Sequence, residues 1–131
     1  MKHAFKQKVY YSDTDAYGVV WHGSYLRWLE MGRVDLCNQT GHTISSLQDE
    51  NIVLPVAEIN IKYRASAKLD DIILINTQIK ETSRCSMTFY QTITDESEKK
   101  MYIEAIVKVV ATDKNGKLYR SLPEQLNAML S

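Results

Sequence analysis

The sequence predicts an α+β fold in which one long helix covers one face of a five-stranded antiparallel sheet. One stretch of the chain has helical periodicity, and most of the remainder alternates apolar and polar residues as strands do. The β-type stretches follow one another with short connections, which favour antiparallel pairing. A single helix must then bury its apolar face against the sheet.

The helix is predicted to run from Ser24 to near Gly41. Ser24 is a favourable N-cap residue, and Gly41 stands where a helix commonly ends. Gly32 in the interior should cost about 1 kcal/mol relative to Ala, so we expect it to permit close packing on the sheet. The apolar face repeats at helical spacing and consists of Tyr25, Trp28, Leu29, Gly32 and Leu36.

The strands are predicted from β-rich runs separated by turn residues. The first covers residues 4–11 and is followed by a loop over residues 12–23. Residues 43–51 form a short helix or a turn, and a short helix follows Pro123. The four later strands lie at residues 58–63, 72–79, 87–94 and 103–112.

The length and charge of the chain limit its class. At 131 residues we expect one domain over residues 1–131. The chain has 16 Lys and Arg and 16 Asp and Glu, so it lacks the basic excess that would indicate a nucleic-acid partner. A net charge near zero gives little protection against self-association, which favours an oligomer.

No membrane segment, signal peptide or metal site is expected. The longest aliphatic run, residues 72–75, is too short to span a bilayer, and the N-terminus is charged early. The sequence therefore predicts a cytoplasmic protein. Cys37 and Cys85 form no CxxC pair and are expected to be reduced, and the three histidines lack metal-ligand spacing.

Candidate catalytic residues gather in residues 13–25, where two aspartates, two glycines and a histidine run directly into the predicted helix. A helix N-terminus offers unpaired backbone N–H groups and partial positive charge, which can polarise a carbonyl. A carboxylate beside it can attack a carbonyl carbon or activate water. From these residues alone, an ordinary Asp- and Gly-rich turn remains the alternative.

Residues 10–25, YYSDTDAYGVVWHGSY, resemble the signature of the 4-hydroxybenzoyl-CoA thioesterase family. The likeness is closest to the Tol–Pal-associated, YbgC-like branch of acyl-CoA thioesterases. It continues in supportive stretches at residues 63–71, 89–91 and 120–123, and so extends over nearly the whole chain.

The resemblance implies a single hot-dog domain, with a curved sheet wrapped around the long helix. It implies hydrolysis of an acyl-CoA to the free acid and CoA, with no metal or redox cofactor. Such proteins pair through their sheets as homodimers or dimers of dimers (homotetramers), with active sites at the interface. The branch also suggests acyl carrier protein as a partner, although no residue of this chain indicates it.

The resemblance also assigns roles to residues. The second Asp of the D-x-D pair is catalytic and maps to Asp15, while Asp13 is expected to bond loop N–H groups. The backbone N–H that polarises the thioester carbonyl maps to His22, with Gly23 beside it. Tyr17 replaces a smaller residue of the family and is expected to shape the acyl pocket.

The remaining candidates concern substrate binding and a rival carboxylate. Tyr25 is expected in the core, with one edge lining the acyl pocket. Glu30, on the helix itself, is the rival catalytic position, and a solvated surface Glu is the favoured interpretation of it. CoA phosphates require cations, and the candidates at turns or beside family-like stretches are Lys68, Arg84 and Arg120.

Two other functions compete with the thioesterase. A non-catalytic acyl-CoA- or partner-binding module could use the same fold, because fold alone does not fix function. A dehydratase of this fold needs a histidine in a Pro-rich loop, and neither Pro55 nor Pro123 adjoins a histidine. The sequence therefore favours the thioesterase first and the dehydratase last.

Overall fold

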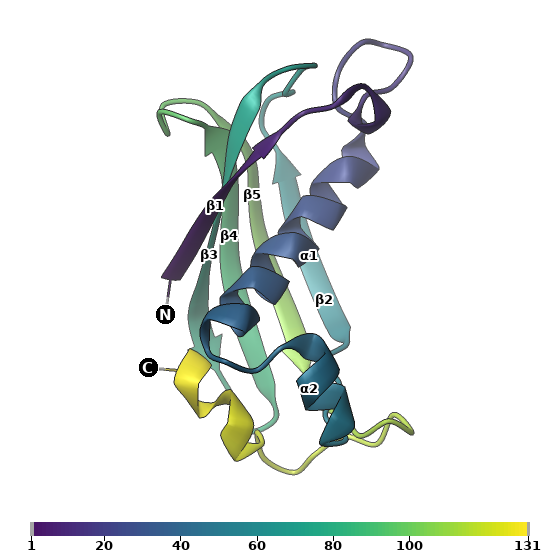
Figure 1. The fold of residues 1–131 in the computed structure, drawn as a ribbon, viewed down its shortest axis with the longest axis vertical. Coiled ribbons are helices and arrows are strands. Elements are labelled where there is room, and N and C mark those ends of the chain that lie inside the picture. The colour runs from purple at the N-terminus through teal and green to yellow at the C-terminus, as the bar shows by residue number, and fades with distance from the viewer. Residues whose placement is uncertain (1, 131) are drawn as a thin grey trace.

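A computed structural model describes residues 2–130 (Figure 1). Two short 3₁₀ segments, η1 (Tyr11–Asp13) and η2 (Glu124–Met129), accompany the helices and strands. The helices are α1 (His22–Gln39) and α2 (Ile44–Asp49), and the strands are β1 (Lys2–Lys8), β2 (Val56–Tyr63), β3 (Ile72–Thr82), β4 (Ser86–Asp95) and β5 (Met101–Val110).

The five strands form one sheet in the order β1-β3-β4-β5-β2, and each neighbouring pair is antiparallel. Figure 1 shows α1 lying across one face of this sheet, with α2 and η2 at one end. The predicted α+β architecture, a five-stranded antiparallel sheet with one long helix, is confirmed. Strands β1 and β2 are the two edges of the sheet.

The core lies between α1 and the sheet. Trp28, Leu29 and Leu36 on α1 are completely buried, as are Ile75 and Ile93 on the facing strands. Gly32 sits where the helix approaches strands β3 and β4 closely. A Cβ atom there would lie 2.5 Å from Thr77 Oγ1 and 2.9 Å from Gln91 Nε2, so the expected close packing is confirmed.

Several predicted boundaries are wrong by a few residues, and two of these lie at the loop that leads into α1. Strand β1 ends at Lys8 rather than at residue 11, because the Val9 N–H bonds to the Asp71 carbonyl and the chain then turns into η1. Helix α1 begins at His22, with Trp21 as N-cap, rather than at Ser24. The Ser24 hydroxyl instead donates to the Asp13 carbonyl at 3.0 Å.

The strand register gives the sheet two distinct ends. One end, beside the N-terminus of α1, holds the last residue of β2 and the first of β3, Tyr63 and Ile72. The opposite end holds the turn between β3 and β4, together with α2 and η2 (Figure 1). This separation decides which candidate site residues can meet within one chain.

Candidate active site

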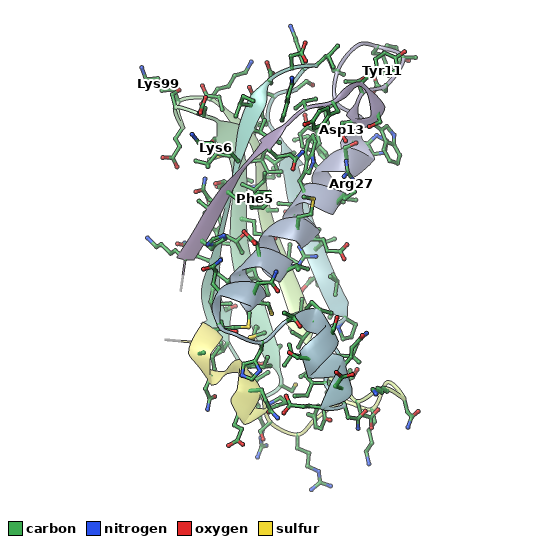
Figure 2. The ribbon with its side chains drawn as sticks, in the orientation of Figure 1. Phe5, Lys6, Tyr11, Asp13, Arg27 and Lys99 are labelled. Carbon is green, nitrogen blue, oxygen red and sulfur yellow. The ribbon has the colours of Figure 1, made fainter. Side chains whose placement is uncertain are left out.

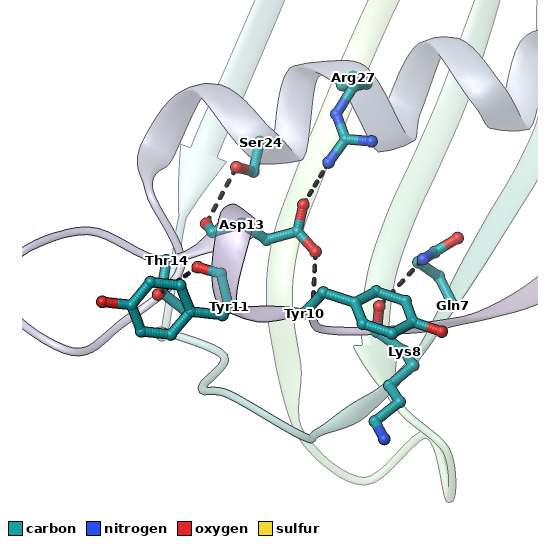
Figure 3. Close-up of polar contacts among 8 residues, drawn as sticks. All are labelled: Gln7, Lys8, Tyr10, Tyr11, Asp13, Thr14, Ser24 and Arg27. Carbon is teal, nitrogen blue, oxygen red and sulfur yellow. Dashed lines mark hydrogen bonds and ion pairs between the residues drawn. The ribbon is translucent and has the colours of Figure 1, made fainter.

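Asp13 organises the loop that leads into α1 (Figure 3). Its buried carboxylate accepts a hydrogen bond from the Tyr10 N–H at 2.9 Å and forms an ion pair with Arg27 of α1. Its backbone carbonyl accepts from the Trp21 N–H at 2.9 Å and from the Ser24 hydroxyl. Asp13 therefore joins both ends of the loop to the first turns of the helix, the structural role expected of it.

Arg27 was not among the predicted site residues. Figure 2 shows its side chain beside Asp13 at the N-terminal end of α1, with Tyr11 on the adjoining loop. Its signal in the sequence is weak, because it is one of many exposed cations and its partner lies 14 residues away. Only the fold brings the two charges together.

Backbone hydrogen bonds within the loop hold its two arms together. The Asp15 N–H donates to the Val19 carbonyl at 2.9 Å, and the Gly18 N–H donates to the Asp15 carbonyl at 3.0 Å. Thr14 and Val20 form a bridge that brings the two arms of the loop together. Gly18 has φ +81°, a left-handed conformation that favours glycine.

The Asp15 carboxylate is half-buried and oriented by the backbone. Its Oδ1 accepts a hydrogen bond from the Tyr17 N–H at 2.8 Å. Its Oδ2 has no hydrogen-bond partner within residues 2–130. One oxygen is thus held in place by the backbone, and the other makes no hydrogen bond in the described part of the chain.

The N-terminus of α1 provides backbone donors at the end of the same loop. Trp21, the N-cap residue, supplies no capping side chain, and no acidic residue lies in the first turn. The N–H groups of His22 and Gly23 have no partner in the described part of the chain, as expected for the first residues of a helix. A Cβ at Gly23 would lie 2.3 Å from the exposed Trp21 ring, so a larger residue there would require that ring to move.

Two tyrosines, Tyr25 of α1 and Tyr63 of β2, pack together beside the N-terminus of α1. Tyr25 is 2% exposed, and its hydroxyl oxygen accepts a hydrogen bond from the Ala67 N–H at 2.9 Å. Burial raises the pKa of Tyr25. Its ring packs edge-on against Tyr63, whose hydroxyl donates to the His22 carbonyl at 3.3 Å. Tyr63 begins the family-like stretch at residues 63–71, but no local pattern predicts it as a site residue.

Lys68 and Tyr17 lie at the same end of the molecule as Asp15. Lys68 forms a backbone bridge with Val19, and its side chain is exposed beside the loop. Tyr17, at the tip of the loop, is 91% exposed and lines none of the pockets described for the chain. Lys68 is therefore near the candidate site, whereas the Tyr17 ring is open to solvent.

Arg84 and Arg120 lie away from Asp15 within one chain. Arg84 is in the turn between β3 and β4, and its carbonyl accepts a hydrogen bond from the Leu122 N–H at 2.9 Å. Both arginines are exposed near the end of the sheet that carries η2. The 11-residue length of β3 separates them from the Asp15 loop.

Within residues 2–130, no group of three or more His, Cys, Asp and Glu side chains is arranged to hold a metal ion. In the same range, no helix is long and apolar enough to span a membrane.

The arrangement defines a class of protein. A five-stranded antiparallel sheet with one long helix packed against it is the architecture of the hot-dog thioesterases. The family model described as "Thioesterase superfamily" matches residues 17–102. The chain belongs to this family, and it is a thioester hydrolase.

Individual relatives agree with this assignment. The chain is 35% identical over 121 residues to acyl-CoA thioester hydrolase YbgC of Escherichia coli O6:H1, covering 92% of this chain and 90% of that protein. It is 30% identical over 126 residues to acyl-CoA thioesterase YbgC of Haemophilus influenzae, covering 95% and 91%. The crystal structure of a probable thioesterase from Bartonella henselae superposes with a TM-score of 0.88 at 28% identity, covering 94% of this chain and all of that one. The predicted family, fold and enzyme class are confirmed.

Proposed function

We propose that this protein hydrolyses acyl-CoA thioesters to the free acid and CoA, with Asp15 as the catalytic carboxylate. The observation that carries the proposal is the single loop that joins an oriented carboxylate to an uncapped helix N-terminus. Two relatives covered over most of their length are named as acyl-CoA hydrolases, which supports the same substrate class. Such a substrate also fits the cytoplasmic location expected from the sequence.

The thioester carbonyl oxygen would rest on the backbone N–H groups of His22 and Gly23. These groups carry the partial positive charge of the helix N-terminus and stabilise the negative charge that develops on the oxygen. The His22 imidazole is not needed for this role. The Tyr63 hydroxyl, bonded to the His22 carbonyl, helps to hold the first turn in position.

Asp15 then acts through its free oxygen by one of two routes. As a nucleophile it attacks the thioester carbon, releasing CoA thiolate and forming a mixed anhydride that water hydrolyses. As a general base it takes a proton from water as the water oxygen attacks the thioester carbon; the C–S bond then breaks, and the leaving CoA thiolate takes up the proton. Both routes require the same position of the carboxylate, so both predict loss of turnover when Asp15 is neutralised.

We propose that two copies pair through their β2 edges. Strand β2 has one unpaired side, and three of its large side chains are at least 40% exposed: Val56, Ile59 and Tyr63. An exposed edge strand of this kind invites pairing with another chain.

Antiparallel pairing of the two β2 strands would place opposite ends of the two sheets side by side. Arg84 and Arg120 of the second copy would then lie at the same end as the Asp15 loop of the first. There, with Lys68, they could bind the phosphates of CoA. Tyr17 would meet the substrate only at the mouth of such a site, because its ring is exposed at the tip of the loop.

The proposed substrate is tested by thiol release from short-chain, long-chain and aryl acyl-CoAs, with an acyl–acyl carrier protein in parallel. We expect turnover of at least one acyl-CoA class well above the rate without enzyme. If only the carrier-protein thioester is hydrolysed, the substrate is an acyl–acyl carrier protein rather than an acyl-CoA. Binding of acyl-CoA without any turnover would favour the non-catalytic module.

A further inference from the structure

A tight turn over residues 67–71 precedes β3, at the end of the sheet beside the N-terminus of α1. The Asp71 N–H donates to the Lys68 carbonyl at 3.1 Å, and the half-buried Asp71 carboxylate accepts from the Lys68 N–H at 2.8 Å. Asp70 has φ +71°, a left-handed conformation that aspartate adopts more readily than most residues other than glycine. The Asp71 side chain therefore closes the 67–71 turn.

The 67–71 turn holds the entrance of the loop that carries Asp15. Val9, the residue after β1, is completely buried. Its N–H donates to the Asp71 carbonyl at 2.9 Å, and its carbonyl accepts from the Asp70 N–H at 3.0 Å. Two backbone hydrogen bonds thus fix the point at which the chain leaves β1 for the loop.

The same turn holds the returning arm of the loop. The Val20 N–H donates to the Ala67 carbonyl at 2.9 Å, and Val19 forms a backbone bridge with Lys68. The Val19 carbonyl accepts the hydrogen bond from the Asp15 N–H at 2.9 Å. The returning arm therefore connects the Asp15 backbone to the turn.

The turn also contacts α1. Ala67 is completely buried, and its N–H donates to the Tyr25 hydroxyl. The turn is therefore bonded to both arms of the Asp15 loop and to the first turns of the helix. A shift of the turn would move the Asp15 carboxylate relative to the helix N–H groups.

We propose that Asp71 is a positioning residue of this thioesterase, which fixes the Asp15 loop against the N-terminus of α1 by closing the 67–71 turn. This inference rests on the proposed catalytic role of Asp15. Asp71 acts through the backbone of the turn and takes no part in the chemical step, so its role requires a hydrogen-bond acceptor and not a charge. A displacement of about 1 Å at a reacting group can cost on the order of 10²-fold in rate.

The test compares kcat and KM of wild type, Asp71→Ala and Asp71→Asn on the best acyl-CoA substrate. Asp71→Ala leaves the Lys68 N–H without its acceptor, and we expect kcat to fall about tenfold with a smaller change in KM. Asp71→Asn keeps a side-chain oxygen that can accept this bond, so it should retain most of kcat.

The matched control is Asp95→Ala. The Asp95 carboxylate also closes a turn, between β4 and β5, by accepting from the Lys99 N–H at 2.9 Å and the Lys100 N–H at 3.0 Å. None of its hydrogen bonds involves the Asp15 loop. Its loss should lower stability and leave kcat of the folded protein unchanged.

Hydrogen exchange of the peptide covering residues 13–21, followed by mass spectrometry, reports on the loop without any turnover. We expect faster exchange in Asp71→Ala, and exchange like that of wild type in Asp71→Asn and Asp95→Ala. Undiminished turnover by Asp15→Asn would instead defeat the proposed function, and the exchange measurement keeps the two failures apart.

Unchanged exchange, or full kcat in folded Asp71→Ala, overturns the proposal. A loss of kcat in Asp71→Asn as large as that in Asp15→Asn also overturns it, because Asp71 would then be a catalytic group. If Asp71→Ala does not fold, Asp71→Glu takes its place, since it keeps the charge but moves the carboxylate relative to the Lys68 N–H. We expect Asp71→Glu to have a lower kcat than Asp71→Asn, and the reverse order overturns the proposal.

Discussion

Asp13 connects the loop that carries Asp15 to the helix whose N–H groups face the proposed substrate. Asp13→Asn keeps an acceptor for the Tyr10 N–H but removes the charge that pairs with Arg27. We expect kcat to fall about tenfold or more with little change in KM, because small displacements of catalytic groups are costly. Steady-state kinetics of the folded variant measure kcat and KM separately.

The matched control for this change is Glu96→Gln, which removes the charge of an exposed pair with Lys6. An exposed ion pair contributes little, so its kinetics should match wild type. If Asp13→Asn only lowers stability and leaves kcat intact, Asp13 does not position the site.

Substitution of Tyr25 distinguishes a structural role of this residue from a substrate-binding role. Tyr25→Phe keeps the ring but leaves the Ala67 N–H without its acceptor in a buried position. We expect a loss of roughly 1–3 kcal/mol in the free energy of unfolding, with kcat and KM of the folded protein nearly unchanged. Denaturant unfolding beside kinetics measures both, and Tyr11→Phe, at an 81% exposed position, is the control. A rise in KM without loss of stability would instead place Tyr25 in the acyl pocket.

Individual residues show how far the sequence could predict the site. Asp13 and Asp15 stand in a local motif, and the bonds that hold the loop join residues close in the sequence. Arg27 and Tyr63 depend on tertiary contacts, with Tyr63 bonded to a residue 41 positions away. No local pattern reports a contact over that separation.

At the scale of elements, the packing of α1 depends on Gly32. Alanine normally stabilises a helix relative to glycine by about 1 kcal/mol. Here the added Cβ would meet Thr77 Oγ1 and Gln91 Nε2, so we expect Gly32→Ala to destabilise the protein by about 1–3 kcal/mol. Chemical denaturation checks the sign, with Asn38→Ala at an exposed position of α1 as the control. A more stable Gly32→Ala protein would show that the helix can move away from the sheet at little cost.

Periodicity predicted the elements better than their ends. Helix α1 and strands β3 and β5 follow from helical spacing and alternation, since each buries mainly one face, whereas β4 is buried on both faces. The start of α1 was placed at Ser24 because serine is a common N-cap. In the folded protein the Ser24 hydroxyl is used by the Asp13 carbonyl, and the helix begins earlier, at His22.

At the scale of the whole molecule, the proposal requires a second copy to complete the CoA site. Ile59→Lys places a charge on the exposed β2 edge, where side chains of a second copy would bury it. We expect light scattering to report a shift toward monomer, with KM for acyl-CoA rising as the second copy's cations are lost. Leu118→Lys, an exposed apolar position outside the strands, is the control. An unchanged mass and KM for Ile59→Lys would contradict pairing through β2.

The proposed mechanism depends on Asp15, and not on the helix carboxylate Glu30, as the catalytic group. The measurement is kcat for thiol release by wild type, Asp15→Asn and Glu30→Gln on the best acyl-CoA substrate, with folding checked by circular dichroism. We expect Asp15→Asn to lose roughly 10²–10⁴-fold in kcat while Glu30→Gln stays close to wild type. Undiminished turnover by Asp15→Asn, or a comparable collapse in Glu30→Gln alone, would contradict it.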